Sequence, residues 1–179
     1  MHGFIFVEFE KYVIDQFGYQ NWRKVVDKCG IADRGYDSIT LYPDKELFSV
    51  IHETAAQTDT EVPVLLEKFG YYLVPDLMKV YKAYINPTWR TLDLLEHAES
   101  NMHAAVRSST AGAAPPVLVS ERIRPNEIVI QYVSKRNIPE LGVGIIKGIA
   151  AYYLEEDHVQ VVLQKEVEPG KSLISVRYL

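Results

Sequence analysis

The sequence predicts an α+β fold in a single domain of 179 residues, with a helical part over about 1–112 and a sheet-containing part over about 113–179. Two observations support this prediction. Apolar residues recur at helical spacing through the first part, and the period changes to two after Pro115-Pro116. Helices that are segregated from an antiparallel sheet are typical of α+β proteins. Because two prolines stiffen the chain, Pro115-Pro116 marks the expected joint between the two parts.

The first three helices are bounded by glycine and proline. Apolar residues at four-residue spacing predict a helix over 5–17 that ends before Gly18. Segment 21–29 predicts a short second helix. Pro43 stands where a third helix would begin, since proline fits the first turn of a helix.

Two further helices are expected before the proline pair. Asp59 or Thr60 can cap a fourth helix, which Pro75 should end or kink. After Pro87 comes the longest apolar pattern, with Thr88 as the expected cap. This pattern predicts one uninterrupted helix of roughly twenty residues.

The sheet-containing part begins with two segments in which apolar and polar residues alternate, 117–123 and 128–136, and which predict an antiparallel hairpin. Segment 139–156 returns to a helical pattern. Two further strands, 158–167 and 171–179, are joined by a turn that contains proline and glycine. The predicted order is therefore strand, strand, helix, strand, strand.

Composition excludes several classes of protein. With 47% hydrophobic residues the chain can bury a substantial core, and its formal net charge of -5 argues against a nucleic-acid partner. No apolar run approaches the length of a membrane span, and Glu8 and Glu10 interrupt the start where a signal peptide is apolar. The single cysteine, Cys29, excludes an internal disulfide. We therefore expect a cytoplasmic protein that has no membrane partner.

His103 is the first candidate site residue. It lies on the longest predicted helix, at the edge of the apolar stripe. A lone histidine in such a place is often an ordinary residue at the boundary of the core. A single helical histidine also suits a haem, because the porphyrin supplies four iron ligands and a proximal imidazole the fifth.

A second candidate is the cluster formed by Tyr132, Ser134 and Arg136, here called the Tyr-Ser-Arg cluster. Side chains alternate between the two faces of a strand, so these three are expected to project from the same face. Ile128 and Ile130 come earlier in the strand and project from that face too. A phenol, a hydroxyl and a guanidinium together suit an anion with an apolar body, and haem propionates fit that description. The alternative interpretation is a strand end that emerges into solvent.

Catalysis has little support in the sequence. No serine lies in the context of a nucleophile elbow, and Cys29 has no evident base partner. Gly142, Gly144 and Gly148 fall inside an apolar helix without the strand that precedes a phosphate-binding loop. We expect these glycines to allow close packing, and we expect the protein not to be an enzyme.

These residues resemble the haem nitric oxide/oxygen-binding (H-NOX) family, the sensor domain also found at the N-terminus of soluble guanylate cyclase. The likeness covers the whole chain. Its residues are Met1, Gly3 and Ile5 at the start, Phe69-Gly70, His103, Pro115-Pro116, and the Y-x-S-x-R signature at Tyr132, Ser134 and Arg136.

The resemblance implies a haem b buried between the two parts of the chain. His103 resembles the proximal iron ligand, and the Tyr-Ser-Arg cluster resembles the clamp that holds both propionates. Ile5 and Pro116 are similar to the residues that press on the porphyrin and hold it out of plane. In the family, ligand binding flattens the haem and shifts the proximal helix.

Ligand choice follows from the distal residues that the resemblance assigns. Members that hold oxygen carry a distal tyrosine, and the matching position here is Leu141. The whole assigned group, here called the distal set, is Phe9, Leu73, Leu77, Leu141 and Ile145. All five are apolar, which favours nitric oxide and carbon monoxide and excludes oxygen, because bound oxygen benefits from a hydrogen-bond donor. Tyr71 or Tyr72 would supply such a donor if the helix register differed.

The resemblance therefore implies a non-enzymatic haem gas sensor. Its signal would pass to a separate protein, a histidine kinase or a cyclic-dinucleotide enzyme, as in stand-alone bacterial members. The alternative is a haem-free binding or adaptor module of the same fold. No cysteine follows Cys29, so the cysteine-ligated zinc site of some bacterial relatives is not expected.

Overall fold

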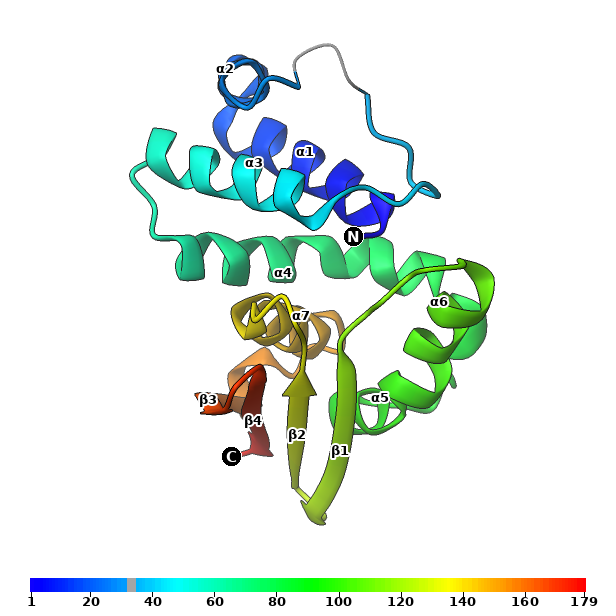
Figure 1. Cartoon of the computed structure of the whole chain (residues 1–179). Helices are drawn as coiled ribbons and strands as arrows, with labels where there is room; N and C mark the ends of the chain where they lie inside the picture. Colours follow the sequence, from blue (N-terminus) through cyan, green and yellow to red (C-terminus); the bar gives the residue numbers. More distant parts are fainter. Residues whose placement is uncertain (32–34) are drawn as a thin grey trace.

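The computed structural model describes residues 1–31 and 35–179, and this part of the chain has the predicted α+β architecture (Figure 1). The segments that precede the sheet are α1 (Gly3–Phe17), α2 (Tyr19–Lys28), α3 (Asp44–Gln57), α4 (Val62–Val80), η1 (Lys82–Tyr84), α5 (Thr91–Ala98), η2 (Glu99–His103) and α6 (Ala104–Ser109). The rest comprises β1 (Val117–Arg124), β2 (Glu127–Val133), α7 (Pro139–Tyr152), η3 (Glu156–His158), β3 (Val159–Glu168) and β4 (Lys171–Tyr178). Within the described residues, no helix is both long and apolar enough to cross a membrane.

The elements form layers around α4. Helices α1, α2 and α3 lie on one side of α4, and α7 and the sheet lie on the other (Figure 1). One buried apolar cluster joins α1 to α4, and a second joins α4, α5, α7 and the sheet. The helical half and the sheet half therefore each have a core, and α4 contributes to both.

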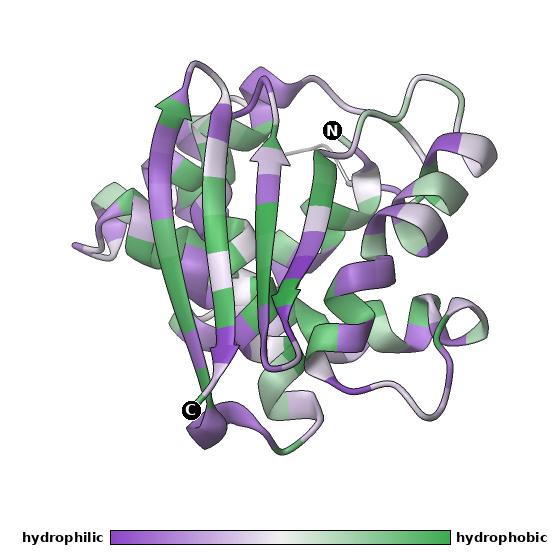
Figure 2. Ribbon diagram, turned by 90° about the horizontal axis from the view of Figure 1, so that it is seen from below, coloured by the Kyte–Doolittle hydropathy of each residue, from purple (hydrophilic) through white to green (hydrophobic). Residues whose placement is uncertain are grey.

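The sheet has the antiparallel order β1-β2-β4-β3. Side chains alternate between its faces, so Ile128, Ile130 and Tyr132 of β2 are buried while Val133 is exposed. Figure 2 shows the strands in front and the helices behind them, so the helices cover one face of the sheet. In the β1–β2 hairpin Leu118 is the register partner of Tyr132, which places both residues side by side on the covered face.

The crossing of α4 and α7 depends on glycine. A Cβ at Gly144 would lie 1.9 Å from the carbonyl oxygen of Glu67, and one at Gly70 would lie 2.3 Å from that of Leu141. Both obstacles are backbone atoms, so a larger side chain could be accommodated only if one helix moved away. The expectation that the glycines of α7 allow close packing is confirmed at Gly144.

We predict that Gly144→Ala destabilises the protein by about 3 kcal/mol, because the two helices must separate. Urea unfolding monitored by circular dichroism measures the loss. Gly142→Ala is the matched control, because its Cβ would meet only side-chain atoms, the nearest 3.6 Å away. Alanine is the better helix former, so the control should be neutral or slightly more stable. Equal stability of the two variants would contradict this account of the crossing.

Of the two outcomes predicted for Pro75, an end or a kink of the fourth helix, the end is wrong. Helix α4 continues past Pro75 to Val80. Pro75 lies on the exposed side, while Val74 beside it is buried against the second core. Packing on that side therefore outweighs the one backbone hydrogen bond that proline cannot make. The helix also starts later than predicted, with Glu61 rather than Asp59 or Thr60 at its N-cap position.

The longest predicted helix is present as a run of three segments rather than as one regular helix. It begins at Thr91, where the Asp93 carboxylate accepts a hydrogen bond of 3.1 Å from the Arg90 backbone N–H, so Thr88 is not the cap. The middle segment, η2, is a π-helical turn that ends at His103. We call Thr91–Ser109 the proximal run, because it carries the candidate proximal histidine. π-Helical turns are rare and are frequently found at functional sites.

The last predicted helix is also shorter than expected. Helix α7 ends at Tyr152, and the acidic segment from Glu156 belongs to the short helix η3. The carboxylate of Glu155 accepts hydrogen bonds from Thr91 and Tyr178, which ties this connection to α5 and β4. These contacts hold the chain in a turn where the helical pattern alone predicted a further helical turn.

Candidate functional site

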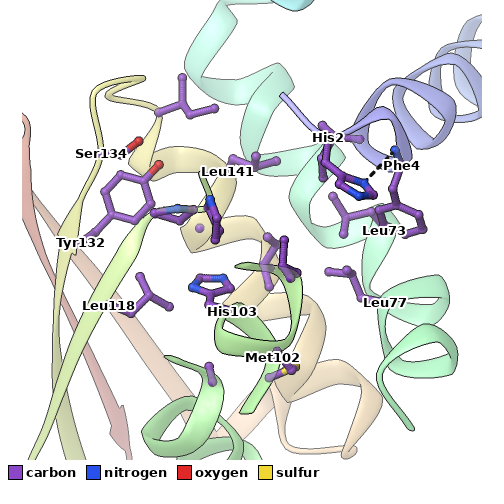
Figure 3. A pocket seen from close by; sticks show the side chains of 18 of the residues that line it. His2, Phe4, Leu73, Leu77, Met102, His103, Leu118, Tyr132, Ser134 and Leu141 are labelled. Atoms are coloured by element: carbon purple, nitrogen blue, oxygen red, sulfur yellow. Dashed lines mark hydrogen bonds between the residues drawn. The ribbon is translucent and has the colours of Figure 1, made fainter. Parts of the chain in front are cut away.

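A cavity of about 240 Å³ lies between the helical core and the sheet core. Its walls come from the start of α1, from α4, the proximal run, β1, β2 and α7, so both halves of the chain are needed to form it. The lining is mainly apolar and includes Leu73, Leu77, Met102, Val106, Leu118 and Leu141. Figure 3 shows His103 within this space, with Tyr132 and Ser134 on one side and Leu73 and Leu77 on the other. A largely apolar cavity with a few polar groups is the usual form of a cofactor site.

His103 enters the cavity from the end of the π turn. Its Nδ1 lies 3.1 Å from the Oε2 atom of Glu99. A carboxylate only accepts hydrogen bonds, so Nδ1 carries the hydrogen and Nε2 keeps its lone pair. Burial lowers the pKa of His103, although Glu99 opposes the shift. The ring is therefore neutral at pH 7, which is the form that binds a metal.

Glu99 connects the proximal run to β1. Its Oε2 also accepts a hydrogen bond of 3.0 Å from the backbone N–H of Leu118, and its Oε1 accepts one from Arg107. Partial burial opposes ionisation of Glu99, but these contacts and that with His103 hold the pKa of its carboxyl below the usual value. Glu99 is therefore ionised at neutral pH.

The Tyr-Ser-Arg cluster lies at the end of β2 rather than along it. Strand β2 ends at Val133, so Ser134 and Arg136 belong to the turn that follows, and the prediction of three side chains on one strand face is wrong in that detail. The Ser134 hydroxyl accepts a hydrogen bond of 3.2 Å from the backbone N–H of Arg136, and this contact shapes the turn. All three residues nevertheless line the same cavity. Burial raises the pKa of Tyr132, so its phenol stays protonated and can donate a hydrogen bond.

Arg136 also joins a charged network at the edge of the cavity. Its Nε lies 2.8 Å from the Oδ2 of Asp44 at the start of α3, and its Nη1 donates to the carbonyl oxygen of Ala114. The Met1 ammonium lies 2.6 Å from the other carboxylate oxygen of Asp44. Although partial burial opposes the shift, the Met1 ammonium and Arg136 hold the pKa of Asp44 below its usual value. Arg136 is thereby fixed against both halves of the protein.

The structure brings most of the other candidate residues to the cavity. Ile5 and Pro116 line it, and so do four members of the distal set: Leu73, Leu77, Leu141 and Ile145. Phe9 does not line it. Phe9 is fully buried in the helical core, where its ring packs edge-on against Phe69 at a centroid distance of 5.0 Å.

The two tyrosines that could have supplied a distal donor point elsewhere. Tyr71 is 40% exposed, and its hydroxyl lies 3.3 Å from a carboxylate oxygen of Glu156. The hydroxyl of Tyr72 donates to the carboxylate of Asp15 on α1. Neither side chain is among those that line the cavity.

Sequence reasoning assigned no role to several residues that the structure places at or beside the cavity. The polar or charged ones include His2, Tyr81, Asp44 and Glu99. His2 lines the cavity, and its Nδ1 accepts a hydrogen bond of 3.4 Å from the Phe4 N–H at the start of α1 (Figure 3). Helical spacing of four residues does place Glu99 beside His103, and this spacing is the signal that could have given Glu99 a role. Nothing in the sequence indicated that Asp44 would meet a residue 92 positions away.

The residues of the cavity fit a haem. One neutral imidazole is enough for axial ligation because the porphyrin nitrogens occupy four positions on the iron. Apolar side chains from α4 and α7 suit the faces of the macrocycle, and the Tyr-Ser-Arg cluster supplies hydroxyl, phenol and guanidinium donors for carboxylates at its edge.

Comparison with known sequence families decides the identification. The profile of the haem-NO-binding (HNOB) family matches residues 2–161. The chain belongs to this family. Its members are haem-binding domains that bind nitric oxide and are sensors rather than enzymes, so the expectation of a non-catalytic protein is confirmed. No curated protein sequence shows a significant match to the chain.

Solved structures of H-NOX proteins share the fold. An H-NOX protein from S. oneidensis in the Fe(II)NO state has a TM-score of 0.90 at 20% identity, covering 100% of this chain and 99% of that one. The unliganded Fe(II) H-NOX protein from K. algicida has a TM-score of 0.84 at 21% identity, with 100% and 97% covered. A variant H-NOX protein from T. tengcongensis has a TM-score of 0.86 at 17% identity, with 99% and 97% covered.

Proposed function

We propose that this HNOB domain is a gas sensor that holds haem b in the cavity, binds nitric oxide and carbon monoxide, and excludes oxygen. The observation that carries the proposal is the cavity itself, in which the neutral imidazole of His103 faces a mainly apolar wall while the anion-binding groups gather at the edge. The haem supplies a ferrous iron with an open coordination position for a diatomic gas.

The residues of the chain have distinct roles in this proposal. His103 holds the iron through Nε2, because its Nδ1 is engaged by Glu99. The Tyr-Ser-Arg cluster holds the propionates and so fixes the orientation of the macrocycle. Ile5 and Pro116 line the cavity from α1 and from the segment before β1, where they would press on a bound porphyrin.

The selectivity against oxygen rests on the wall opposite His103. Leu73, Leu77, Leu141 and Ile145 present hydrocarbon there, and the hydroxyls of Tyr71 and Tyr72 are bonded to carboxylates elsewhere. Oxygen gains from a hydrogen-bond donor when it binds, whereas nitric oxide and carbon monoxide bind well without one. An apolar wall therefore favours the latter two gases.

The signal would leave through the proximal run. Glu99 joins this run to β1, so a displacement of His103 is passed to the sheet as well as along the helix. We infer that a separate signalling protein, a histidine kinase or a cyclic-dinucleotide enzyme, responds to this displacement.

Gas titration tests the proposed selectivity. The protein is reduced under nitrogen and its visible absorption is recorded as nitric oxide, carbon monoxide or air is added. We expect the spectrum to shift with the first two gases and to show no stable oxygen complex in air. An oxygen complex that persists in air would overturn the selectivity, and failure to take up haem would favour the haem-free adaptor module.

A further inference from the structure

The carboxylate of Glu99 receives contacts from three separate parts of the site. One oxygen, Oε2, lies 3.1 Å from His103 Nδ1 and 3.0 Å from the Leu118 backbone nitrogen. The other oxygen accepts a hydrogen bond from Arg107, one helical turn beyond His103. The Glu99 side chain is 27% exposed, so solvent competes only in part for these contacts.

Other acidic residues of the proximal run have a different environment. Asp93 and Glu96 both pair with Arg122 on β1, at 2.8 Å each, and no hydrogen bond joins either of them to His103. These are contacts between a helix and a strand at the surface. Glu99 also contacts β1, but it does so with the same oxygen that meets the imidazole.

The π turn contributes to this geometry. Glu99 is the first residue of η2 and His103 is the last. The carboxylate and the ring are therefore joined by this one π-helical turn. The Leu118 N–H and Arg107 each donate to the carboxylate, one to Oε2 and the other to Oε1, and so hold it beside the ring. The orientation of the His103 ring is therefore set by Glu99, whose carboxylate Arg107 and β1 hold in turn.

We propose that Glu99 is a positioning residue that orients His103 and strengthens its bond to the haem iron. The inference rests on the proposed function, since it requires His103 to be the axial ligand. A histidine that donates its second N–H to a carboxylate is fixed in one tautomer and is a more basic ligand. Glu99 thus favours retention of the bond between His103 and the iron when nitric oxide binds.

Resonance Raman spectroscopy of the reduced, haem-loaded protein gives the first test. Glu99→Gln removes the charge but keeps the shape, and we expect the iron–histidine stretching band to move to lower frequency. Glu96→Gln is the matched control, because it removes the same charge from the same run and breaks a contact to β1 without touching His103. An unshifted band in Glu99→Gln, or an equal shift in both variants, would overturn the inference.

The main comparison of a second test uses a protein in which Glu99 is unchanged. In His103→Gly with Glu99 intact, free imidazole can donate to the carboxylate, whereas 1-methylimidazole has no N–H to give. We expect imidazole to bind the haem about tenfold more tightly than 1-methylimidazole, and Glu99→Gln in the same background to reduce that preference. Equal affinities would contradict a role for Glu99.

The two proposals fail in different ways. If neither imidazole restores ligation in His103→Gly and the unaltered protein shows no iron–histidine band, His103 is not the ligand and the proposed site is wrong. If imidazole restores ligation but Glu99 has no effect on the band or on the affinity, only the inference about Glu99 is wrong.

Discussion

His103→Gly should lose the iron–histidine bond while the fold is retained. The imidazole is the one nitrogen ligand that the proximal run directs into the cavity, and its loss leaves the iron without a protein ligand on that side. Exogenous imidazole should enter the vacated space and restore the absorption spectrum of the unaltered reduced protein. The measurement is a spectrophotometric titration of the reduced variant with imidazole.

His97→Gly provides the control for this experiment. His97 lies on the same run, but its Nδ1 contacts the backbone oxygen of Asp93 and its ring stacks on Trp89, so it does not reach the cavity. We expect this variant to keep the spectrum of the unaltered protein. Loss of the native spectrum in His97→Gly, with retention in His103→Gly, would show that the wrong histidine had been chosen.

Leu141→Tyr should give the protein a stable complex with oxygen. Leu141 lies near the start of α7 on the wall of the cavity, and a phenol there would supply the donor that the apolar wall lacks. Bound oxygen carries partial negative charge, and a hydrogen bond to a charged group contributes roughly 1.5–3 kcal/mol to binding. The oxygen affinity should therefore rise roughly tenfold to hundredfold. Absorption spectra recorded at a series of oxygen pressures measure the affinity.

Leu141→Phe separates the effect of the hydroxyl from that of the ring. Phenylalanine fills nearly the same space and cannot donate, so it should leave oxygen affinity low. If phenylalanine raised oxygen affinity as much as tyrosine did, shape rather than hydrogen bonding would control ligand choice, and the account of selectivity would be wrong.

Much of the fold follows from local pattern. Gly18, with a φ of 88°, ends the first helix where predicted, because glycine adopts that conformation without strain. The strands were predictable because the alternation of Ile128, Ile130 and Tyr132 matches the period of a half-covered sheet. In both cases the sequence signal lies within a few consecutive residues.

The errors occur where distant contacts decide the structure. Helix α4 passes through Pro75 because packing against the sheet half holds it, and no local signal reports that packing. The π turn before His103 contains neither glycine nor proline, so the apolar pattern alone predicts a regular helix there. The ion pair between Asp44 and Arg136 joins residues far apart in the chain, and only the folded structure brings them together.

The residues of the candidate site also fall into those that the sequence predicts and those that depend on distant packing. His103 and the Tyr-Ser-Arg cluster were predictable because their chemistry is unusual for their positions, and the structure brings them to one cavity. The resemblance assigned Phe9 to the distal set, but its side chain is not among those that line the cavity and packs in the helical core. Alignment with the family indicates which helix a residue lies on. The packing of α1 on α4 determines which residues of that helix face the cavity.

A crystal structure of the reduced, haem-loaded protein tests the central claim most directly. We predict a haem in the cavity between the two cores, with its iron on Nε2 of His103, Nδ1 of that ring donating to Glu99, and its propionates held by Tyr132, Ser134 and Arg136. A haem bound at another place, or an iron held by a residue other than His103, would contradict the account.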